Sequence, residues 1–296
     1  MPLTGEPGPM HHRANIVLFG EMGAGKSSLV NLIMGFDHDV APTSSGASSC
    51  TLDAKLYDAT IQGRDFRIFD TAGLNEPQLP RGQPHPLRDP DRLIGAINKA
   101  YSLIKLLSDT GGINLLVFCI RKGRITVNMQ QNYKLFHDFL CHKKVPIALV
   151  VTHLEHEENM ERWWLDNHPH FTECGIHIVD HACITAKREF GDRYDESRQL
   201  VHDLLIRRGC GVPFTQERVS WVTEFFQKLL DLVGFRPRLD SFKVRAKKLR
   251  EYGLKDNEIA VLLTKISAVD EDVALVRSPR HHGLQLLLHT RRGTLM

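Results

Sequence analysis

A glycine-rich segment near the N-terminus has the residue types and spacing that bind phosphate groups. Residues 20–27 read G-x-x-x-x-G-K-S between a short apolar run and a helix-compatible stretch. Glycines permit a tight turn that exposes consecutive amides, and the N-terminal end of the following helix attracts anions. The Lys26 ammonium suits the β- and γ-phosphates, and the Ser27 hydroxyl suits Mg2+. We therefore expect a nucleoside triphosphate to contact Gly20, Glu21, Met22, Gly23, Ala24, Gly25, Lys26, Ser27 and Ser28.

A second motif follows at the distance expected for the other half of a phosphate site. Asp70 ends an apolar strand, and Gly73 stands three residues later in D-x-x-G spacing. A carboxylate at that strand end can reach the shell of a Mg2+ ion through water, and the Gly73 amide can face a γ-phosphate. Ser27 and Asp70 are therefore predicted metal-site residues.

A third segment has the side chains needed to select a base. Thr152-His153-Leu154-Glu155 follows an apolar strand. A carboxylate can accept hydrogen bonds from N1–H and the exocyclic amine of guanine, which adenine cannot offer. Glu155 has one methylene more than the aspartate that G proteins have in an [NT]-K-x-D motif, so it can do this if the backbone shifts. His153 can stack on the base. Thr185 and Ala186, after the last strand, would back the base. The alternative is an ordinary polar loop with Glu155 exposed.

These motifs require strands that end beside one another. From Asn15 onward, apolar strands alternate with amphipathic helices, which predicts a mainly parallel sheet in an α/β fold. The expected strands are Ile16–Phe19, Leu52–Thr60, Phe66–Asp70, Leu115–Cys119, Ile147–Val151 and Ile176–Asp180. The expected helices are Ser27–Gly35, Asp91–Ser108, Asn128–Leu140, Met160–Asn167, Asp195–Arg208 and Val219–Val233.

The chain divides into three parts. The Pro- and Gly-rich residues 1–13 are expected to be disordered, residues 14–234 to form a three-layer P-loop domain, and residues 235–296 to form a helical, partly disordered extension with a helix over Leu254–Ser267. Two long segments, 36–50 and 72–90, have no assignment. Loops of that length within a compact domain usually have a function.

Composition excludes several classes of protein. The 296 residues have a formal charge of +3, from 38 basic and 35 acidic side chains, which is too balanced for a nucleic-acid partner. No apolar run approaches the roughly 20 residues of a transmembrane helix, and no signal peptide is evident, so we expect a cytoplasmic protein. The 6 cysteines are scattered without C-x-x-C pairs, which indicates neither a disulfide framework nor a zinc site.

The motifs, taken in order, resemble those of the septin-like branch of P-loop GTPases. Besides GEMGAGKS, DTAG, THLE and TAK, the Lys122-Gly123-Arg124-Ile125-Thr126 segment at the start of a helix resembles the extra box of the immunity-associated GTPases. A Thr-His in the base motif also occurs in the chloroplast outer-envelope import GTPases, and the chain is similar to G-domain-containing proteins of fungi. The resemblance covers roughly residues 16–208 and implies a G domain that binds GTP or GDP with Mg2+.

The resemblance also implies catalytic and partner residues. A switch threonine should meet Mg2+ and the γ-phosphate, with Thr51 the first choice and Thr43 the second; Lys26 and Thr51 are thus the predicted catalytic residues, and Thr51 joins the metal set. Related proteins pair G domains face to face, so Arg124 or Arg121 could contact a second copy in a GTP-dependent homodimer. Both arginines could equally be ordinary solvated charges.

Three functions remain open. Leu74 stands where Ras-like enzymes have the glutamine that orients water, so we expect slow hydrolysis in a nucleotide-controlled switch or self-associating GTPase with an unidentified effector protein. Asn75 and Glu76 are nearby candidates for the missing contact. A GTP-bound scaffold without turnover is the second reading, and a P-loop kinase or ATPase is the third. Glu155 argues against the third, since it would select guanine.

Overall fold

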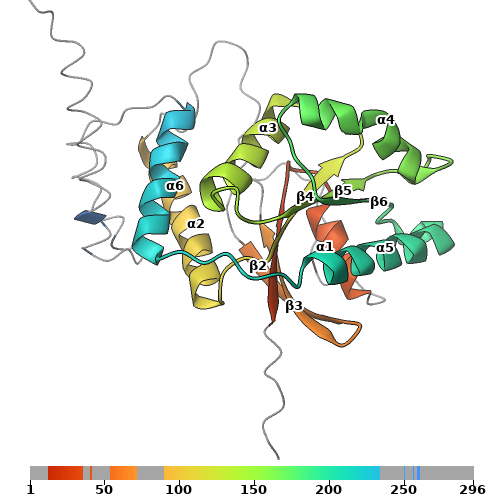
Figure 1. Cartoon of the computed structure of the whole chain (residues 1–296), viewed down its shortest axis with the longest axis horizontal. Coiled ribbons are helices and arrows are strands. Elements are labelled where there is room, and N and C mark those ends of the chain that lie inside the picture. The colour runs from red at the N-terminus through yellow and green to blue at the C-terminus, as the bar shows by residue number, and fades with distance from the viewer. Residues whose placement is uncertain are drawn as a thin grey trace, which may run out of the picture.

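A six-stranded sheet forms the centre of the molecule, with helices on both faces (Figure 1). The computed structural model describes residues 13–35, 41, 54–71, 90–233, 250, 256, 259 and 260. The strands are β1 Ala14–Phe19, β2 Ala54–Ile61, β3 Arg64–Thr71, β4 Leu115–Arg121, β5 Ile147–Thr152 and β6 Asp180–Cys183. Their order across the sheet is β2-β3-β1-β4-β5-β6, and only the β2–β3 pair is antiparallel. The predicted mainly parallel, three-layer α/β fold is confirmed.

The helices follow the strands in alternation. They are α1 Lys26–Met34, α2 Pro90–Asp109, α3 Val127–Tyr133, the π-helix η2 Lys134–Leu140, α4 Met160–Glu173, the short 3-10 helix η3 Arg188–Phe190, α5 Asp192–Arg208 and α6 Arg218–Val233. Among the described residues, no helix is long and apolar enough to cross a membrane. The cytoplasmic location stays a prediction.

Each central strand is buried on both faces because its side chains alternate between two hydrophobic cores. In β1, Ile16 and Leu18 pack in the core beneath α1 and α5, whereas Val17 and Phe19 pack in the core beneath α2, α6 and the π-helix. Phe19 stacks between the rings of Phe118 and Phe136, at centroid distances of 4.8 and 4.6 Å. The continuous apolar runs in the sequence therefore reflect two cores rather than one.

Helix α6 is attached to the same face as α2 (Figure 1). Trp221 is fully buried there, and its indole N–H donates to the Leu140 carbonyl at 2.6 Å. Phe214 meets its ring edge-on at a centroid distance of 5.5 Å. Ile259, from the predicted C-terminal extension, is also buried in this core. The proposed boundary at residue 234 stays a prediction.

The predicted strand over Ile176–Asp180 is wrong. The structure begins β6 at Asp180 and ends it at Cys183. Ile176 instead packs beneath α4 from a loop, and Val179 is 47% exposed. Because β6 is an edge strand that pairs only with β5, it tolerates the polar residues Asp180 and His181, whereas the sequence pattern favoured a more apolar run.

Helix boundaries also differ from those predicted. The helix expected over Asn128–Leu140 is an α-helix that continues as a π-helix, and its N-cap is Thr126, whose hydroxyl accepts from the Met129 amide. Helix α4 continues to Glu173 with Pro169 inside it, although the prediction stopped it at Asn167. Strand boundaries differ as well, because β2 and β3 form a tight hairpin in which β2 ends at Ile61 and β3 begins at Arg64. Such boundaries depend on packing more than on local sequence.

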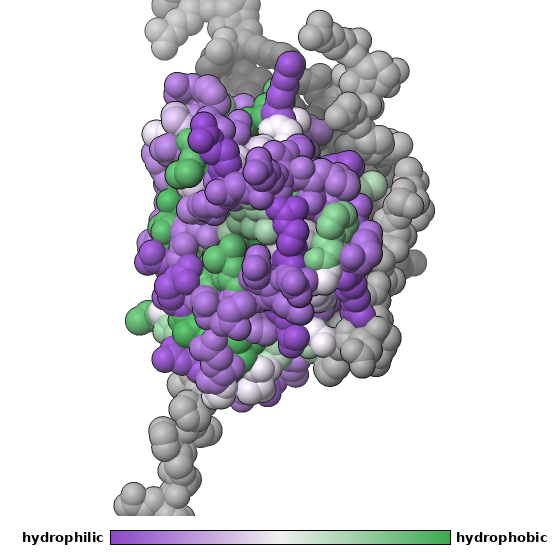
Figure 2. Space-filling model, turned by 90° about the vertical axis from the view of Figure 1, so that its right-hand side faces the viewer, coloured by the Kyte–Doolittle hydropathy of each residue, from purple (hydrophilic) through white to green (hydrophobic). Residues whose placement is uncertain are grey.

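The surface shows no dominant apolar patch on the face drawn in Figure 2. That face is mostly hydrophilic, with apolar residues in small groups. Among the described residues, the exposed large apolar side chains come from separate parts of the chain: Met22, Leu56, Val127, Leu165, Val179 and Val212. Scattered apolar side chains of this kind are normal on protein surfaces.

Candidate functional site

The parallel strands place the predicted motifs together, because their carboxyl ends lie at one edge of the sheet. The glycine-rich loop follows β1, Asp70 lies at the end of β3, and Thr152 ends β5. The segment 184–187 follows β6. The described site residues Gly20 to Ser28, Asp70, Thr152, His153, Glu155, Thr185 and Ala186 all lie at this edge.

Two glycines of the loop are required by close contacts. A Cβ atom on Gly20 would lie 2.0 Å from the Cys119 carbonyl oxygen of β4. Gly25 has a φ of +83° at the N-cap of α1, and a Cβ there would lie 3.1 Å from the Thr152 side chain. The loop therefore lies against β4 and β5, where the contact with β4 excludes a side chain at Gly20 and the left-handed backbone favours glycine at position 25.

Lys26 is the first residue of α1 and folds back over the loop. Its ammonium donates to the carbonyl oxygens of Gly20 at 2.9 Å and Glu21 at 3.0 Å. The side chain is buried, and burial lowers the pKa of this ammonium. The negative charges of Asp70 and Glu21 oppose this effect. A phosphate group near this buried cation and the helix N-terminus would be attracted by both.

Ser27 and Asp70 form an oxygen pair beside the lysine. The Ser27 hydroxyl donates to Asp70 Oδ2 at 2.9 Å. Burial raises the pKa of the Asp70 carboxyl, while the Ser27 hydrogen bond and the Lys26 charge lower it in part. A hydroxyl and a partly desolvated carboxylate are hard oxygen donors of the kind that Mg2+ prefers, so the residues fit that ion. Among the described residues, no group of three or more His, Cys, Asp or Glu forms another metal site.

Thr152 connects the base motif to the phosphate loop. Its hydroxyl lies 3.0 Å from the Ala24 carbonyl and 3.2 Å from the Ile120 carbonyl, and is within hydrogen-bond distance of both. His153 follows with a φ of +64°, a left-handed conformation that is uncommon for a residue with a side chain. Its Nδ1 lies 2.8 Å from Thr152 Oγ1. Burial lowers the pKa of His153, and the nearby Arg121 adds to this effect, which favours the neutral imidazole.

Glu155 is buried, contrary to the alternative of an exposed polar loop. Its side chain is 5% exposed, and the Lys187 ammonium lies 2.8 Å from Oε1. Burial alone would raise the pKa of this carboxyl, but the hydrogen bond and charge of Lys187 outweigh it and lower the pKa. Within the described part of the chain, Oε2 has no hydrogen-bond partner. A buried carboxylate oxygen without a partner is costly, and a donor on a ligand would relieve that cost.

The segment after β6 packs against this loop. Thr185 is fully buried, and its amide donates to the Ser197 hydroxyl of α5 at 3.1 Å. The Lys187 amide donates to Thr185 Oγ1 at 3.3 Å. These contacts position the segment from which the Lys187 ammonium reaches Glu155. That Thr185 and Ala186 back a base stays a prediction.

Some predicted site residues lie outside the described part of the chain. These are the switch candidates Thr51 and Thr43, Gly73 of the D-x-x-G motif, and Leu74, Asn75 and Glu76. Their roles stay predictions. The long segments 36–50 and 72–90 are likewise described only at Ala41 and Pro90.

Sequence reasoning missed three connections within the site. The Thr126 hydroxyl donates to the Glu21 carboxylate, so the helix-starting box contacts the phosphate loop. Lys122 pairs with Glu157, and Arg193 donates to the backbone of the base loop. Lys187 was within the TAK pattern, but nothing local in the sequence pointed to Arg193.

Comparison with known proteins identifies a family for the chain. A family model described as 50S ribosome-binding GTPase matches residues 15–185. GTPase Der of Nitrobacter hamburgensis is 39% identical over 59 residues, which are 20% of this chain and 12% of that protein. GTP-binding protein A of Dictyostelium discoideum is 33% identical over 69 residues, 23% of this chain and 14% of that protein. The aligned stretch is thus a small part of each curated relative.

Solved structures with a similar arrangement include two G proteins. Era from Aquifex aeolicus, bound to GDP.AlF4-, is 15% identical with a TM-score of 0.45, over 70% of this chain and 58% of that chain. A dimerization-deficient mutant of Toc33 from Arabidopsis thaliana is 14% identical with a TM-score of 0.41, over 67% of this chain and 86% of that chain. The family model, in contrast, spans more than half of the 296 residues. The chain therefore belongs to the 50S ribosome-binding GTPase family, a family of GTP-binding P-loop GTPases.

Proposed function

We propose that this chain binds Mg2+-GTP through the site at the carboxyl edge of the sheet and selects guanine with Glu155. The observation that carries this proposal is the Glu155 carboxylate, which is 5% exposed and has one oxygen without a described partner. Each carboxylate oxygen has two lone pairs, so Oε1 can accept from Lys187 and from a ligand at the same time. Guanine offers two adjacent donors to such a group.

The remaining site residues supply the phosphate and metal contacts in this proposal. Lys26 and the amides of the glycine-rich loop would hold the β- and γ-phosphates. Ser27 would hold Mg2+, with Asp70 acting through water, and the ion would neutralise phosphate charge. Thr185 and Ala186 would back the base, and His153 would stack on it.

The experiment that tests this proposal is a calorimetric titration of the purified chain with GTP and with ATP, each with Mg2+. GTP should bind with little binding of ATP. Replacing Glu155 with Ala removes two charge-assisted hydrogen bonds, so GTP affinity should fall by about 10- to 100-fold or more while ATP affinity changes little.

Glu158 provides the matched control, because it is an exposed glutamate on the same loop. Glu158→Ala should leave GTP affinity unchanged. Equal losses of GTP and ATP affinity in Glu155→Ala would contradict base selection by this residue. Preferred binding of ATP by the unmodified chain would instead favour the kinase or ATPase reading.

We further propose that hydrolysis is slow and that GTP controls self-association, as in a switch of the septin-like branch. Leu74 supports slow hydrolysis, since its side chain cannot polarise water. The exposed Arg124 supports an interface, because it lies two residues before Thr126, which contacts Glu21 of the phosphate loop. Phosphate release under saturating Mg2+-GTP separates slow turnover from a scaffold that does not turn over.

Self-association has its own test. The molar mass in solution should increase with GTP but not with GDP or without nucleotide, and Arg124→Ala should weaken the increase. A molar mass that stays at the monomer value under all three conditions would contradict the proposed interface. The effector would then have to bind the single G domain.

A further inference from the structure

Arg193 makes an unusual set of contacts with the loop that contains Glu155. It is the second residue of α5, and its guanidinium donates from Nη1 to the Glu155 carbonyl at 2.7 Å. Its Nη2 donates to the carbonyls of Glu157 and of Glu158, the latter at 3.1 Å. The planar, multiply donating guanidinium is suited to binding several acceptors at once. One side chain thus holds three backbone positions within four residues.

The loop has other attachments as well: Leu154 is fully buried in the core, and the Lys187 ammonium pairs with the Glu155 side chain. The Leu154 amide reaches the Ile184 carbonyl only at 3.4 Å, and the Glu157 amide closes a local turn onto the Leu154 carbonyl at 3.0 Å. The ion pair between Lys122 and Glu157 lies at the surface, where such pairs contribute little. Arg193 therefore makes the most hydrogen bonds among these attachments, and its contacts include the backbone of Glu155 itself.

The same turn of α5 contacts both segments that are proposed to bind the base. The Ser197 hydroxyl donates to the Arg193 carbonyl at 2.7 Å and accepts from the Thr185 amide. The loop of Glu155 and the segment of Thr185 are thus positioned by one helical turn. Any change in the Arg193 contact should alter where the Glu155 carboxylate lies relative to Thr185.

We propose that Arg193 is a positioning residue that sets the guanine preference of the site, by fixing the backbone from which Glu155 extends. This inference rests on the proposed binding of GTP. A glutamate is one methylene longer than an aspartate, so it reaches the same base edge only from a displaced backbone. The three hydrogen bonds of Arg193 hold the backbone in one position, and the carboxylate can then meet both N1–H and the exocyclic amine.

The test compares GTP with inosine triphosphate (ITP), which retains N1–H but lacks the exocyclic amine. Dissociation constants are measured by calorimetry with Mg2+ for the unmodified chain, R193Q, R193K and R207Q. Arg207 is the matched control, because it lies at the other end of α5 and pairs with Asp180, away from the base loop.

The unmodified chain should prefer GTP to ITP. In R193Q the ratio of the two affinities should fall about tenfold, as expected if one hydrogen bond to a charged group is lost. R193K keeps the charge but not the planar fork, and should show an intermediate ratio. R207Q should keep the ratio of the unmodified chain.

A second readout needs no nucleotide. Amide hydrogen exchange at residues 155–158 should be faster in R193Q than in the unmodified chain, and unchanged there in R207Q. If R193Q does not fold, R193K carries the same comparison. Equal losses of GTP and ITP affinity in the Arg193 variants would overturn the inference. The proposal that the unmodified chain binds GTP would still stand.

Two results on the unmodified chain are equally decisive. Equal affinity for GTP and ITP would overturn the inference, because Glu155 would then not read the exocyclic amine. Failure to bind GTP at all would overturn the proposed function and, with it, this inference.

Discussion

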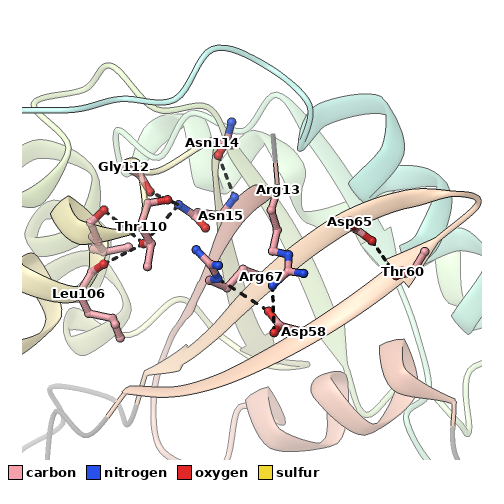
Figure 3. A network of polar contacts seen from close by, with 11 residues as sticks. Arg13, Asn15, Asp58, Thr60, Asp65, Arg67, Leu106, Thr110, Gly112 and Asn114 are labelled. Atoms are coloured by element: carbon pink, nitrogen blue, oxygen red, sulfur yellow. Dashed lines mark hydrogen bonds and ion pairs between the residues drawn. The ribbon is translucent and has the colours of Figure 1, made fainter. Parts of the chain in front are cut away.

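The two ends of the sheet both contain buried polar groups, but of different kinds. At the carboxyl end they include three ionisable groups, Lys26, Asp70 and Glu155, beside the buried hydroxyls of Thr152 and Thr185. At the amino end they are the neutral amides of Asn15 and Asn114 (Figure 3). Asn15 donates from its side chain to the carbonyls of Thr110 at 2.9 Å and Gly112 at 2.8 Å, and from its backbone to Asn114 Oδ1 at 2.8 Å.

This amino-end network connects parts of the chain that are distant in sequence. Asn114 donates to the Gly211 carbonyl at 2.7 Å, so β1, the end of α2 and the segment before α6 are joined. Nearby, Asp58 of β2 pairs with Arg67 of β3 and with Arg13, which directly precedes β1 (Figure 3). The acceptors of Asn15 and Asn114 are groups of the protein itself, which is the arrangement of a structural network.

The comparison teaches that a buried oxygen atom without a hydrogen-bond partner does not by itself indicate a ligand site. Asn15 Oδ1 also has no partner among the described residues, as Glu155 Oε2 has none. The difference is charge: burial shifts the pKa values of Lys26 and Asp70, and the pKa of Glu155 is lowered against burial, chiefly by Lys187. Ionisable groups held at such a cost cluster at functional sites.

The largest effect should come from removing the buried cation at the carboxyl end. Lys26→Ala should weaken GTP binding by about 100-fold or more, because several charge-assisted hydrogen bonds to phosphate are lost together. Calorimetry measures the loss, and circular dichroism checks that the chain remains folded. Retention of micromolar affinity would contradict the assignment of the phosphate site and the distinction between the two ends.

A change at the amino end should have a smaller effect, and on folding stability instead of GTP affinity. Asn15→Ala leaves the Thr110 and Gly112 carbonyls without their donor, so the free energy of unfolding should fall by about 1–3 kcal/mol. GTP affinity, measured on the folded protein, should not change. Asn128→Ala, at a partly exposed position at the start of α3, is the control for denaturant unfolding. A loss of GTP affinity in Asn15→Ala would mean that the two ends are coupled.

The smallest effect concerns pH. Folding lowers the pKa of Glu155 below its ordinary 4.5, so its charged form, and with it GTP affinity, should persist from pH 8 to pH 5 and be lost only as pH falls through the lowered value. In Lys187→Gln the largest of the effects that lower the Glu155 pKa is lost while burial remains, so the pKa should rise. GTP affinity should then decline already toward pH 5. Identical pH profiles for the two proteins would show that Lys187 does not keep Glu155 ionised.

Local motifs predicted the glycine-rich turn between β1 and α1 because its geometry is set within eight consecutive residues. The glycines, Lys26 and Ser27 are adjacent in sequence, and the strand before them and the helix after them follow from the apolar pattern. The central strands were predicted for the same reason, since burial on both faces leaves a continuous apolar run. Asp70 could be placed because it ends such a strand.

Contacts between distant segments could not be predicted in the same way. Arg193 lies 38 positions from Glu155, and Lys187 lies 32 positions from it, so their meeting depends on how β5, β6 and α5 pack. The edge strand β6 was displaced in the prediction because pairing on one side only relaxes the need for apolar residues. The change from α-helix to π-helix at Lys134 likewise has no local signal in the sequence.

The buried Trp221 gives the chain an optical signal of its own. It is one of 3 tryptophans, and Trp163 and Trp164 lie together on α4, where both are only partly buried. An indole shielded from water fluoresces at shorter wavelength than a solvated one. If α6 detached from α2 and the π-helix, the hydrogen bond to Leu140 would break and the Trp221 emission would move to the red. A chain with Trp163 and Trp164 replaced by Phe would therefore report the attachment of α6 by fluorescence, without an added dye.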